Sequence, residues 1–185
     1  MTYKESLTAA MDSLAKNQKT VFIGYNTRWG SRANGTLVNV PTAQCIETPV
    51  AENLMAGMAV GMSLEGYLPV VYFERFDFIL NAADAIVNHL DKMAMMSDGQ
   101  FKPRAIIRVV VGSRDQPLFT GPTHTQDFTE AFQKLVSFPV IDLKMQDGLD
   151  YRPHEVYKSI ENSQQSAMVI EYRGLYPNQL DEITH

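Results

Sequence analysis

The chain has 185 residues, and its 16 Lys and Arg against 21 Asp and Glu give a net charge of -5, which argues against a nucleic acid or an anionic membrane as a partner. Its one cysteine, Cys45, excludes an internal disulfide and a thiolate metal cluster, and no pair of histidines has metal-ligand spacing. No apolar run approaches the ~20 residues that span a bilayer, and no leader precedes the first element, so we expect one cytoplasmic domain over residues 1–185.

Apolar and polar stretches alternate along the chain in a way that predicts helices and strands in turn. Apolar residues recur at helical spacing in four segments, which predict helices at 3–17, 79–94, 128–135 and 154–164. Short apolar runs predict strands at 20–25, 45–47, 68–73, 105–111, 139–143 and 167–171. Two irregular stretches, 26–44 and 112–125, are long enough to be functional loops.

A fifth helix, between the second and third strands, is the element around which the chain is organised. Thr48 is a suitable cap, Pro49 fits the first helical position, and Gly66 suits the residue just past the end. Residues 54–64 are apolar almost all round. We therefore expect this helix to be buried on every side.

Glu52 places a carboxylate near the start of this apolar helix, where a charged group is costly unless it is paired or keeps its proton. Three ordinary interpretations are open: an incomplete capping box with Thr48, a favourable interaction with the helix dipole, or an exposed helix end. On the same helix, Gly57 and Gly61 leave one face bare of side chains. That face would allow close approach of the same helix from a second copy, or of a partner chain.

Strands that are apolar throughout and alternate with helices indicate a doubly wound α/β fold, in which a mostly parallel sheet is covered by helices on both faces. In such sheets, ligands bind beyond the carboxyl ends of the strands. Three segments leave strands at that edge: the helix that carries Glu52, the turn at 76–78, and the loop that carries His124. We expect these segments to form a site.

Familiar nucleotide-binding and catalytic motifs are missing from the sequence. The glycines at 57, 61 and 66 lie within and at the end of a helix, so they do not form a dinucleotide-binding fingerprint. No Gly-rich loop precedes Lys-Ser or Lys-Thr, and no nucleophile elbow supports a Ser-His-Asp triad. The site therefore has to be interpreted from its carboxylate, its aromatic residues and its histidine.

A spaced pattern of residues covers positions 20–176. Its members are Glu52, Gly66, Pro69, Val70, Phe73, Phe76, Phe78, Asp84, Asn88, Lys92, Ser97-Asp98-Gly99-Gln100, Pro103, Arg108, His124-Thr125-Gln126, Val169-Ile170-Glu171 and Leu175-Tyr176. This pattern resembles the pyrimidine-binding domain of thiamine-diphosphate enzymes, and above all the β subunit of the decarboxylating component of 2-oxoacid dehydrogenases. Two segments, 51–53 and 121–124, are similar to their counterparts in transketolases.

The resemblance implies roles for four residues. In that family the glutamate matching Glu52 hydrogen-bonds a ring nitrogen of the cofactor's aminopyrimidine and favours the imino form, whose exocyclic nitrogen removes the thiazolium proton to create the ylide. Phe78 matches the aromatic residue that stacks on the aminopyrimidine, with Phe76 as the second candidate. His124 matches the active-site histidine, which handles protons or orients substrate. The residues alone leave it open whether Phe76 and Phe78 both belong to the core.

The family's diphosphate and magnesium site, a Gly-Asp-Gly followed by Asn, has no counterpart in this sequence. The resemblance therefore implies that thiamine diphosphate is shared with a diphosphate-binding subunit on a separate chain, which also holds the magnesium, in a homodimer or heterotetramer. It implies decarboxylation of a small 2-oxo acid, with ketol transfer from a ketose, or a non-catalytic scaffolding subunit, as the alternatives. The C-terminal domain of typical β subunits is also expected to be absent.

Overall fold

A computed structural model describes residues 1–113, 121–144 and 152–176 of the chain, so positions 114–120 of the irregular stretch predicted at 112–125 lie outside the described residues. Helices and strands alternate as the sequence predicts. In chain order they are α1 (Tyr3–Leu14), β1 (Thr20–Gly24), η1 (Thr42–Gln44), β2 (Cys45–Glu47), α2 (Glu52–Leu64), β3 (Leu68–Phe73), η2 (Phe76–Ala82), η3 (Ala85–Leu90), α3 (Met93–Met96), β4 (Ile106–Val111), η4 (Pro122–His124), α4 (Thr129–Leu135), β5 (Val140–Asp142), α5 (Pro153–Ser163), β6 (Ala167–Tyr172) and η5 (Arg173–Leu175), where η marks a short 3₁₀ or π-helix.

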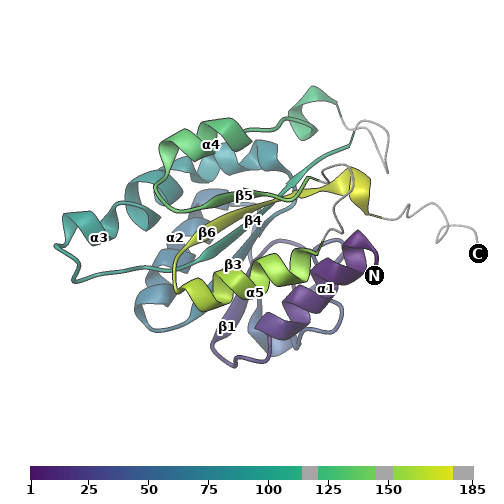
Figure 1. Ribbon diagram of the computed structural model, residues 1–185, viewed down its shortest axis with the longest axis horizontal. Helices are drawn as coiled ribbons and strands as arrows, with labels where there is room; N and C mark the ends of the chain where they lie inside the picture. The colour runs from purple at the N-terminus through teal and green to yellow at the C-terminus, as the bar shows by residue number, and fades with distance from the viewer. Residues whose placement is uncertain (114–120, 145–151, 177–185) are drawn as a thin grey trace, which may run out of the picture.

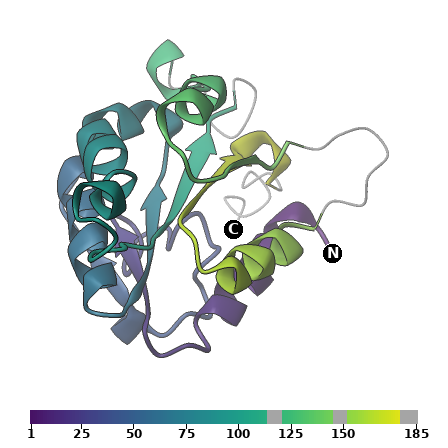
Figure 2. The same cartoon turned by 60° about the vertical axis from the view of Figure 1, so that its left-hand side comes forward.

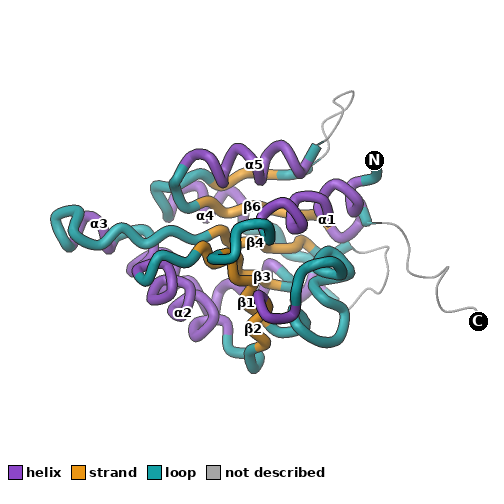
Figure 3. Tube along the Cα trace, turned by 90° about the horizontal axis from the view of Figure 1, so that it is seen from below, coloured by secondary structure: helices purple, strands orange, loops and turns teal. Residues whose placement is uncertain are grey.

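The strands of the described residues form one six-stranded sheet in the order β2-β1-β3-β4-β6-β5, and every neighbouring pair is parallel. Figure 3 shows this order, from β6 near α5 to β2 at the far side. All residues of β1, β3 and β4 are buried, which explains why these strands are mainly apolar in the sequence, apart from Thr20 and Arg108. Cys45 is buried in β2, as expected for a core side chain.

Helices cover both faces of the sheet, which confirms the doubly wound α/β fold (Figures 1 and 2). On one face α1 lies beside α5, and apolar side chains from the loop after β1 belong to the same buried cluster as residues of these two helices. On the other face, α2, η2, η3 and α4 cover the strands. None of the helices that the structure describes is long and apolar enough to cross a membrane.

The start of α2 differs from the prediction. The helix begins at Glu52 rather than at Pro49 after a Thr48 cap. The Thr48 N–H donates to the Gly24 carbonyl at 3.1 Å, so the pairing with β1 continues one residue beyond the end of β2 before the helix begins. The predicted end is confirmed, with Gly66 in the left-handed region at φ +80°.

The expectation that α2 is buried on every side is wrong for this chain. Leu54 and Leu64 are 49% and 40% exposed, and a Cβ atom built at Gly57 or Gly61 would meet nothing within 4 Å. The sheet and the helices η2 and η3 contact only the opposite side of α2. We call Leu54, Gly57, Gly61 and Leu64 the open face of α2.

The helix predicted at 79–94 is three short helical pieces: η2 has 3₁₀ geometry, η3 is a π-helix, and α3 is one α-helical turn. Its predicted apolar face is nevertheless confirmed, because Ile79, Ala82 and Ile86 are completely buried. The change from α to 3₁₀ geometry alters which side chains of η2 lie on one side. This spacing matters for the site.

A buried ion pair ties β4 to β6. Arg108 donates from Nε and Nη2 to the Glu171 carboxylate at 2.8 and 3.0 Å, and both side chains are completely buried. The hydroxyls of Tyr157 and Tyr176 also donate to Glu171, and Thr36 accepts from Arg108. Three residues of the sequence pattern, Arg108, Glu171 and Tyr176, therefore serve the fold.

Candidate functional site

The carboxyl edge of the sheet brings together the three segments predicted to form a site. α2 follows β2, η2 follows β3 and η4 follows β4, so all three begin beyond the same ends of parallel strands. η2 contacts both α2 and η4. Glu52, Phe78 and His124 therefore reach one region from three different loops.

Glu52 is the first residue of α2 and is only 5% exposed. Its Oε2 accepts a hydrogen bond from the Asn81 side-chain amide at 3.3 Å. Burial, and after it the nearby Glu52 and Glu74 carboxylates, raises the pKa of Tyr25 above its usual range, so a neutral phenol lies close to Glu52. The burial excludes an exposed helix end as the explanation for Glu52, and the late helix start excludes a capping box with Thr48. Its first-turn position still suits the helix dipole.

Helix η2 contacts both this carboxylate and the histidine, through Asn81 and Phe78 respectively. Because η2 has three residues per turn, Phe78 and Asn81 project from the same side of it. The rings of Phe78 and His124 meet edge to face, with 5.3 Å between their centroids and 85° between their planes. Both residues are half-buried. The contact between Glu52 and Asn81 and the contact between Phe78 and His124 are thus linked through η2, and we call these four residues the carboxyl-edge row.

Phe76 lies in the core rather than in this row. Its ring is completely buried and packs against Phe128 and Phe132 at centroid distances of 5.7 and 5.8 Å. The sequence left open whether Phe76 and Phe78 both belong to the core. In the structure Phe76 does, whereas Phe78 is half-buried. Any stacking of a cofactor ring in this region rests on Phe78.

Asn81 is the member of the row that sequence analysis missed. It is an exposed polar residue, so neither composition nor burial singles it out. The only signal was its position three residues after Phe78, a spacing that brings two side chains near each other in an α-helix and onto one side in a 3₁₀ helix.

A second carboxylate, Glu47, organises the loop that follows β1. It accepts hydrogen bonds from the backbone N–H groups of four successive residues, 26–29, at 2.6 to 3.3 Å. Burial acts to raise the pKa of Glu47, but the four donors together lower the pKa below its usual value. Glu47 is therefore engaged as an anion that orders the loop.

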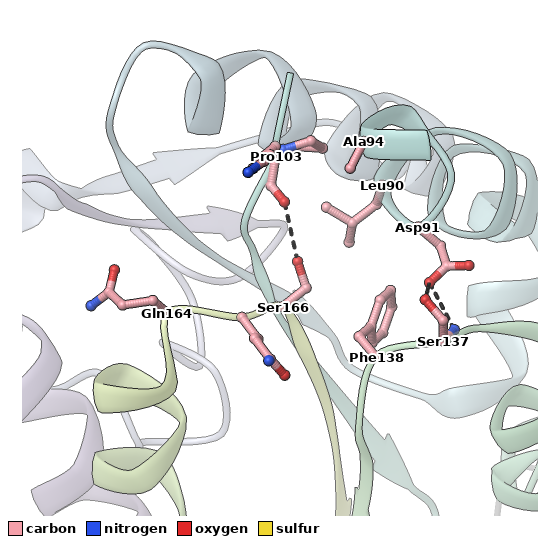
Figure 4. Close-up of a pocket in the computed structure, with 10 residues that line it drawn as sticks. Leu90, Asp91, Ala94, Pro103, Ser137, Phe138, Gln164 and Ser166 are labelled. Atoms are coloured by element: carbon pink, nitrogen blue, oxygen red, sulfur yellow. Dashed lines mark hydrogen bonds between the residues drawn. The ribbon is translucent and has the colours of Figure 1, made fainter. Parts of the chain in front are cut away.

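A cavity of about 360 Å³ lies at the opposite edge, near the starts of β4, β5 and β6, and Figure 4 shows the residues that line it. Several of its polar groups bond one another: the Asp91 carboxylate accepts from the Ser137 N–H and hydroxyl at 2.7 and 2.6 Å, and the Ser166 hydroxyl donates to the Pro103 carbonyl at 3.5 Å. No residue of the carboxyl-edge row lines this cavity. The carboxyl edge is therefore the better candidate for the functional site.

Comparison with known proteins bears on the same residues. The transketolase pyrimidine-binding domain family matches residues 1–138, a range that includes the whole carboxyl-edge row. The mitochondrial pyruvate dehydrogenase E1 component subunit beta of Saccharomyces cerevisiae is 30% identical over 147 residues, which are 76% of this chain and 39% of that protein. The corresponding subunit of Rickettsia conorii is 30% identical over 146 residues, 76% of this chain and 44% of its own length. The chain thus spans less than half the length of these relatives.

A solved structure shows the same fold. It is a split gene transketolase described as an inactive β4 tetramer, and it superposes with a TM-score of 0.68 over 91% of this chain and 50% of its own, at 16% identity. The sequence match, which covers well over half of the chain, carries the assignment beyond the fold. The chain belongs to the transketolase pyrimidine-binding domain family of thiamine-diphosphate enzymes and is similar to the β subunits of the pyruvate dehydrogenase E1 component.

Proposed function

We propose that this chain is one subunit of a split thiamine-diphosphate enzyme, in which residues 1–185 form a single pyrimidine-binding domain. It would bind the cofactor's aminopyrimidine and activate the ylide for decarboxylation of a 2-oxo acid. The observation that carries the proposal is the carboxyl-edge row, which joins a buried carboxylate to an accessible aromatic ring. The similarity to pyruvate dehydrogenase E1 β subunits supports a 2-oxo acid as the substrate class.

The residues of the row fit an aminopyrimidine ring. Asn81 bonds Oε2 of Glu52, and we assign Oε1 to a ring nitrogen of the cofactor. Phe78 is half-buried and offers an apolar surface on which a flat ring can stack. When bound, thiamine diphosphate supplies a carbon nucleophile that adds to the carbonyl of a ketone or 2-oxo acid.

We assign His124 to proton transfer at the substrate. Its Nδ1 lies 3.1 Å from the Thr123 hydroxyl, so Nε2 is the nitrogen that we assign to the substrate side. The edge-to-face contact with Phe78 fixes the imidazole next to the proposed stacking surface. A proton donor or acceptor at this place would lie beside the reacting group.

The proposal includes a partner chain that binds the diphosphate and holds the magnesium. In this chain the open face of α2 offers a surface without side chains at Gly57 and Gly61, flanked by exposed Leu54 and Leu64. Exposed apolar area of this kind is typical of a subunit interface. We propose that it packs against a second copy or the partner, in a homodimer or heterotetramer.

Ketol transfer is the second candidate function. Residues 51–53 and 121–124, which carry Glu52 and His124, resemble transketolase segments. The carboxyl-edge row serves either reaction, because both begin with addition of the cofactor carbon to a carbonyl. The substrate therefore separates the two: turnover of pyruvate or another 2-oxo acid supports the first, and turnover of a ketose phosphate the second.

The test is to copurify the chain with candidate partner chains and to titrate thiamine diphosphate and magnesium by calorimetry. The chain alone, the complex and the complex with Glu52→Gln are compared, and exchange of the thiazolium C2 proton is followed by NMR. Glu65→Gln is the matched control, because it changes an exposed carboxylate just past the other end of the same helix.

We expect tight cofactor binding by the complex and fast C2 proton exchange that Glu52→Gln abolishes and Glu65→Gln preserves. Loss of a catalytic proton contact costs about 10²–10⁴-fold in rate. Exchange that survives in Glu52→Gln would overturn the role of Glu52. A complex that binds no cofactor would favour the scaffolding alternative.

A further inference from the structure

Contacts outside η4 determine where His124 lies. η4 is a single 3₁₀ turn, and its backbone hydrogen bond runs from the His124 N–H to the Gly121 carbonyl at 3.2 Å. One such turn has little stability of its own. The position of the imidazole therefore depends on the contacts that the rest of the domain makes with residues 121–126.

Asp77 makes the polar contact with this segment. It is 8% exposed, and its Oδ1 accepts hydrogen bonds from the Gln126 side-chain amide at 2.7 Å and from the Gln126 backbone N–H at 3.3 Å. Within the residues that the structure describes, its Oδ2 is buried without a hydrogen-bond partner. Gln126 is thus the group that compensates the burial of this carboxylate, and ionised acceptors make strong bonds in such surroundings.

Helix η2, which carries Asp77, also carries Phe78, whose ring contacts that of His124. Asp77 immediately precedes Phe78 in η2, and Gln126 lies two residues beyond His124. The bond from Asp77 to Gln126 and the contact between Phe78 and His124 are therefore two links between the same short segments. If the bond from Gln126 to Asp77 is lost, residues 121–126 lose a contact that holds His124 next to Phe78.

We propose that Asp77 is a positioning residue, which holds His124 against Phe78 through its bonds to Gln126. This inference rests on the proposed function, because the role assigned to His124 is what makes its position matter for catalysis. Asp77 itself is assigned no contact with cofactor or substrate.

The test compares Asp77→Asn and Asp77→Ala in the full chain with isotope-labelled histidine and phenylalanine. The readout is the NMR cross-peak between the rings of His124 and Phe78, with the His124 signal identified by its loss in His124→Gln. Asparagine keeps an acceptor oxygen for Gln126, whereas alanine removes both bonds. We expect the cross-peak to persist in Asp77→Asn and to disappear in Asp77→Ala.

A control separates positioning from loss of stability. Ile86→Val trims a completely buried side chain of η3 and lowers the melting temperature without touching residues 121–126. Gln126→Ala removes the same side-chain hydrogen bond by changing its exposed donor instead of its buried acceptor. This variant tests the positional role if Asp77→Ala does not fold. Loss of the cross-peak in Ile86→Val, or its retention in both Asp77→Ala and Gln126→Ala, would overturn the proposal.

A second measurement uses the complex with its partner. There Asp77→Ala should lower kcat by about 10²-fold, the effect of a misplacement of ~1 Å, while the Kd of thiamine diphosphate is unchanged. An unchanged kcat would also overturn the proposal. If the complex binds no cofactor but the cross-peak behaves as expected, the proposed function fails and the positional role of Asp77 stands.

Discussion

Gly112 is the position at which a single methyl group would displace His124. It follows β4, and a Cβ atom built on it falls far inside van der Waals contact of the His124 carbonyl oxygen and 3.1 Å from the His124 carbonyl carbon. Because the obstacle is backbone, no rotation of a side chain can relieve the clash. In Gly112→Ala the segment that carries His124 has to move by about 1 Å to restore ordinary contact.

The size of the effect follows from this displacement. Overpacking of this kind costs about 1–3 kcal/mol of folding free energy. For a domain of this size that corresponds to a fall of the melting temperature of about 2–4 °C per kcal/mol. The same displacement separates His124 from Phe78, so kcat of the assembled enzyme should fall by about 10²-fold.

The assay combines thermal unfolding of the chain, the His124–Phe78 cross-peak and turnover of the complex. Gly174→Ala is the matched control, since a Cβ atom there lies 3.3 Å from Oγ and 3.4 Å from Cβ of Ser113, which needs an adjustment of only tenths of an ångström. Gly112→Ala should lose the cross-peak and Gly174→Ala should keep it. A Gly112→Ala variant with the wild-type melting temperature and cross-peak would refute this reasoning.

Three further substitutions have expected outcomes. Glu47→Gln should lower the melting temperature at pH 7 and make the melting temperature less dependent on acid. The four N–H donors, against the effect of burial, hold the pKa of Glu47 below its usual value of 4.5. The stability that ionised Glu47 contributes is therefore present above pH 4.5 and is lost as the pH falls through the lowered pKa. Circular dichroism melts between pH 7 and pH 3 check this. Arg108→Met leaves the buried Glu171 carboxylate unpaired and should cost about 3–5 kcal/mol in urea unfolding, a loss that a second substitution, Glu171→Met, should partly recover. Gly57→Leu should not destabilise the isolated chain, because the site is open, but it should weaken subunit association in analytical ultracentrifugation; unchanged association would exclude the open face of α2 as an interface.

The sheet could be predicted because its signal is local. A parallel strand covered on both faces is built mainly of apolar side chains: β3 is apolar throughout, and β1 and β4 depart from this only at Thr20 and at Arg108. The alternation with helices indicates parallel strands, and the carboxyl edge follows from that parallel direction, whereas the order β2-β1-β3-β4-β6-β5 is known only from the structure. The region in which Glu52, Phe78 and His124 meet was predictable for the same reason.

The details of α2 were not predictable, since they depend on neighbours. Thr48 and Pro49 have the local features of a helix start, but in the structure Thr48 continues the strand pairing through its hydrogen bond to Gly24, and the helix begins at Glu52. The apolar composition of α2 predicted complete burial, whereas one chain provides neighbours for only part of its surface. We propose that a second chain covers the open face of α2.

The contacts that refine the site depend on helix type, which composition does not reveal. In the structure Asn81 contacts Glu52, and Asp77 contacts Gln126, from the same short 3₁₀ helix η2. This helix therefore carries both the partner of the proposed catalytic carboxylate and the residue proposed to hold the histidine. A substitution that imposed α-helical geometry on residues 76–82 should disturb both contacts together, because it would change the directions in which Asp77 and Asn81 project.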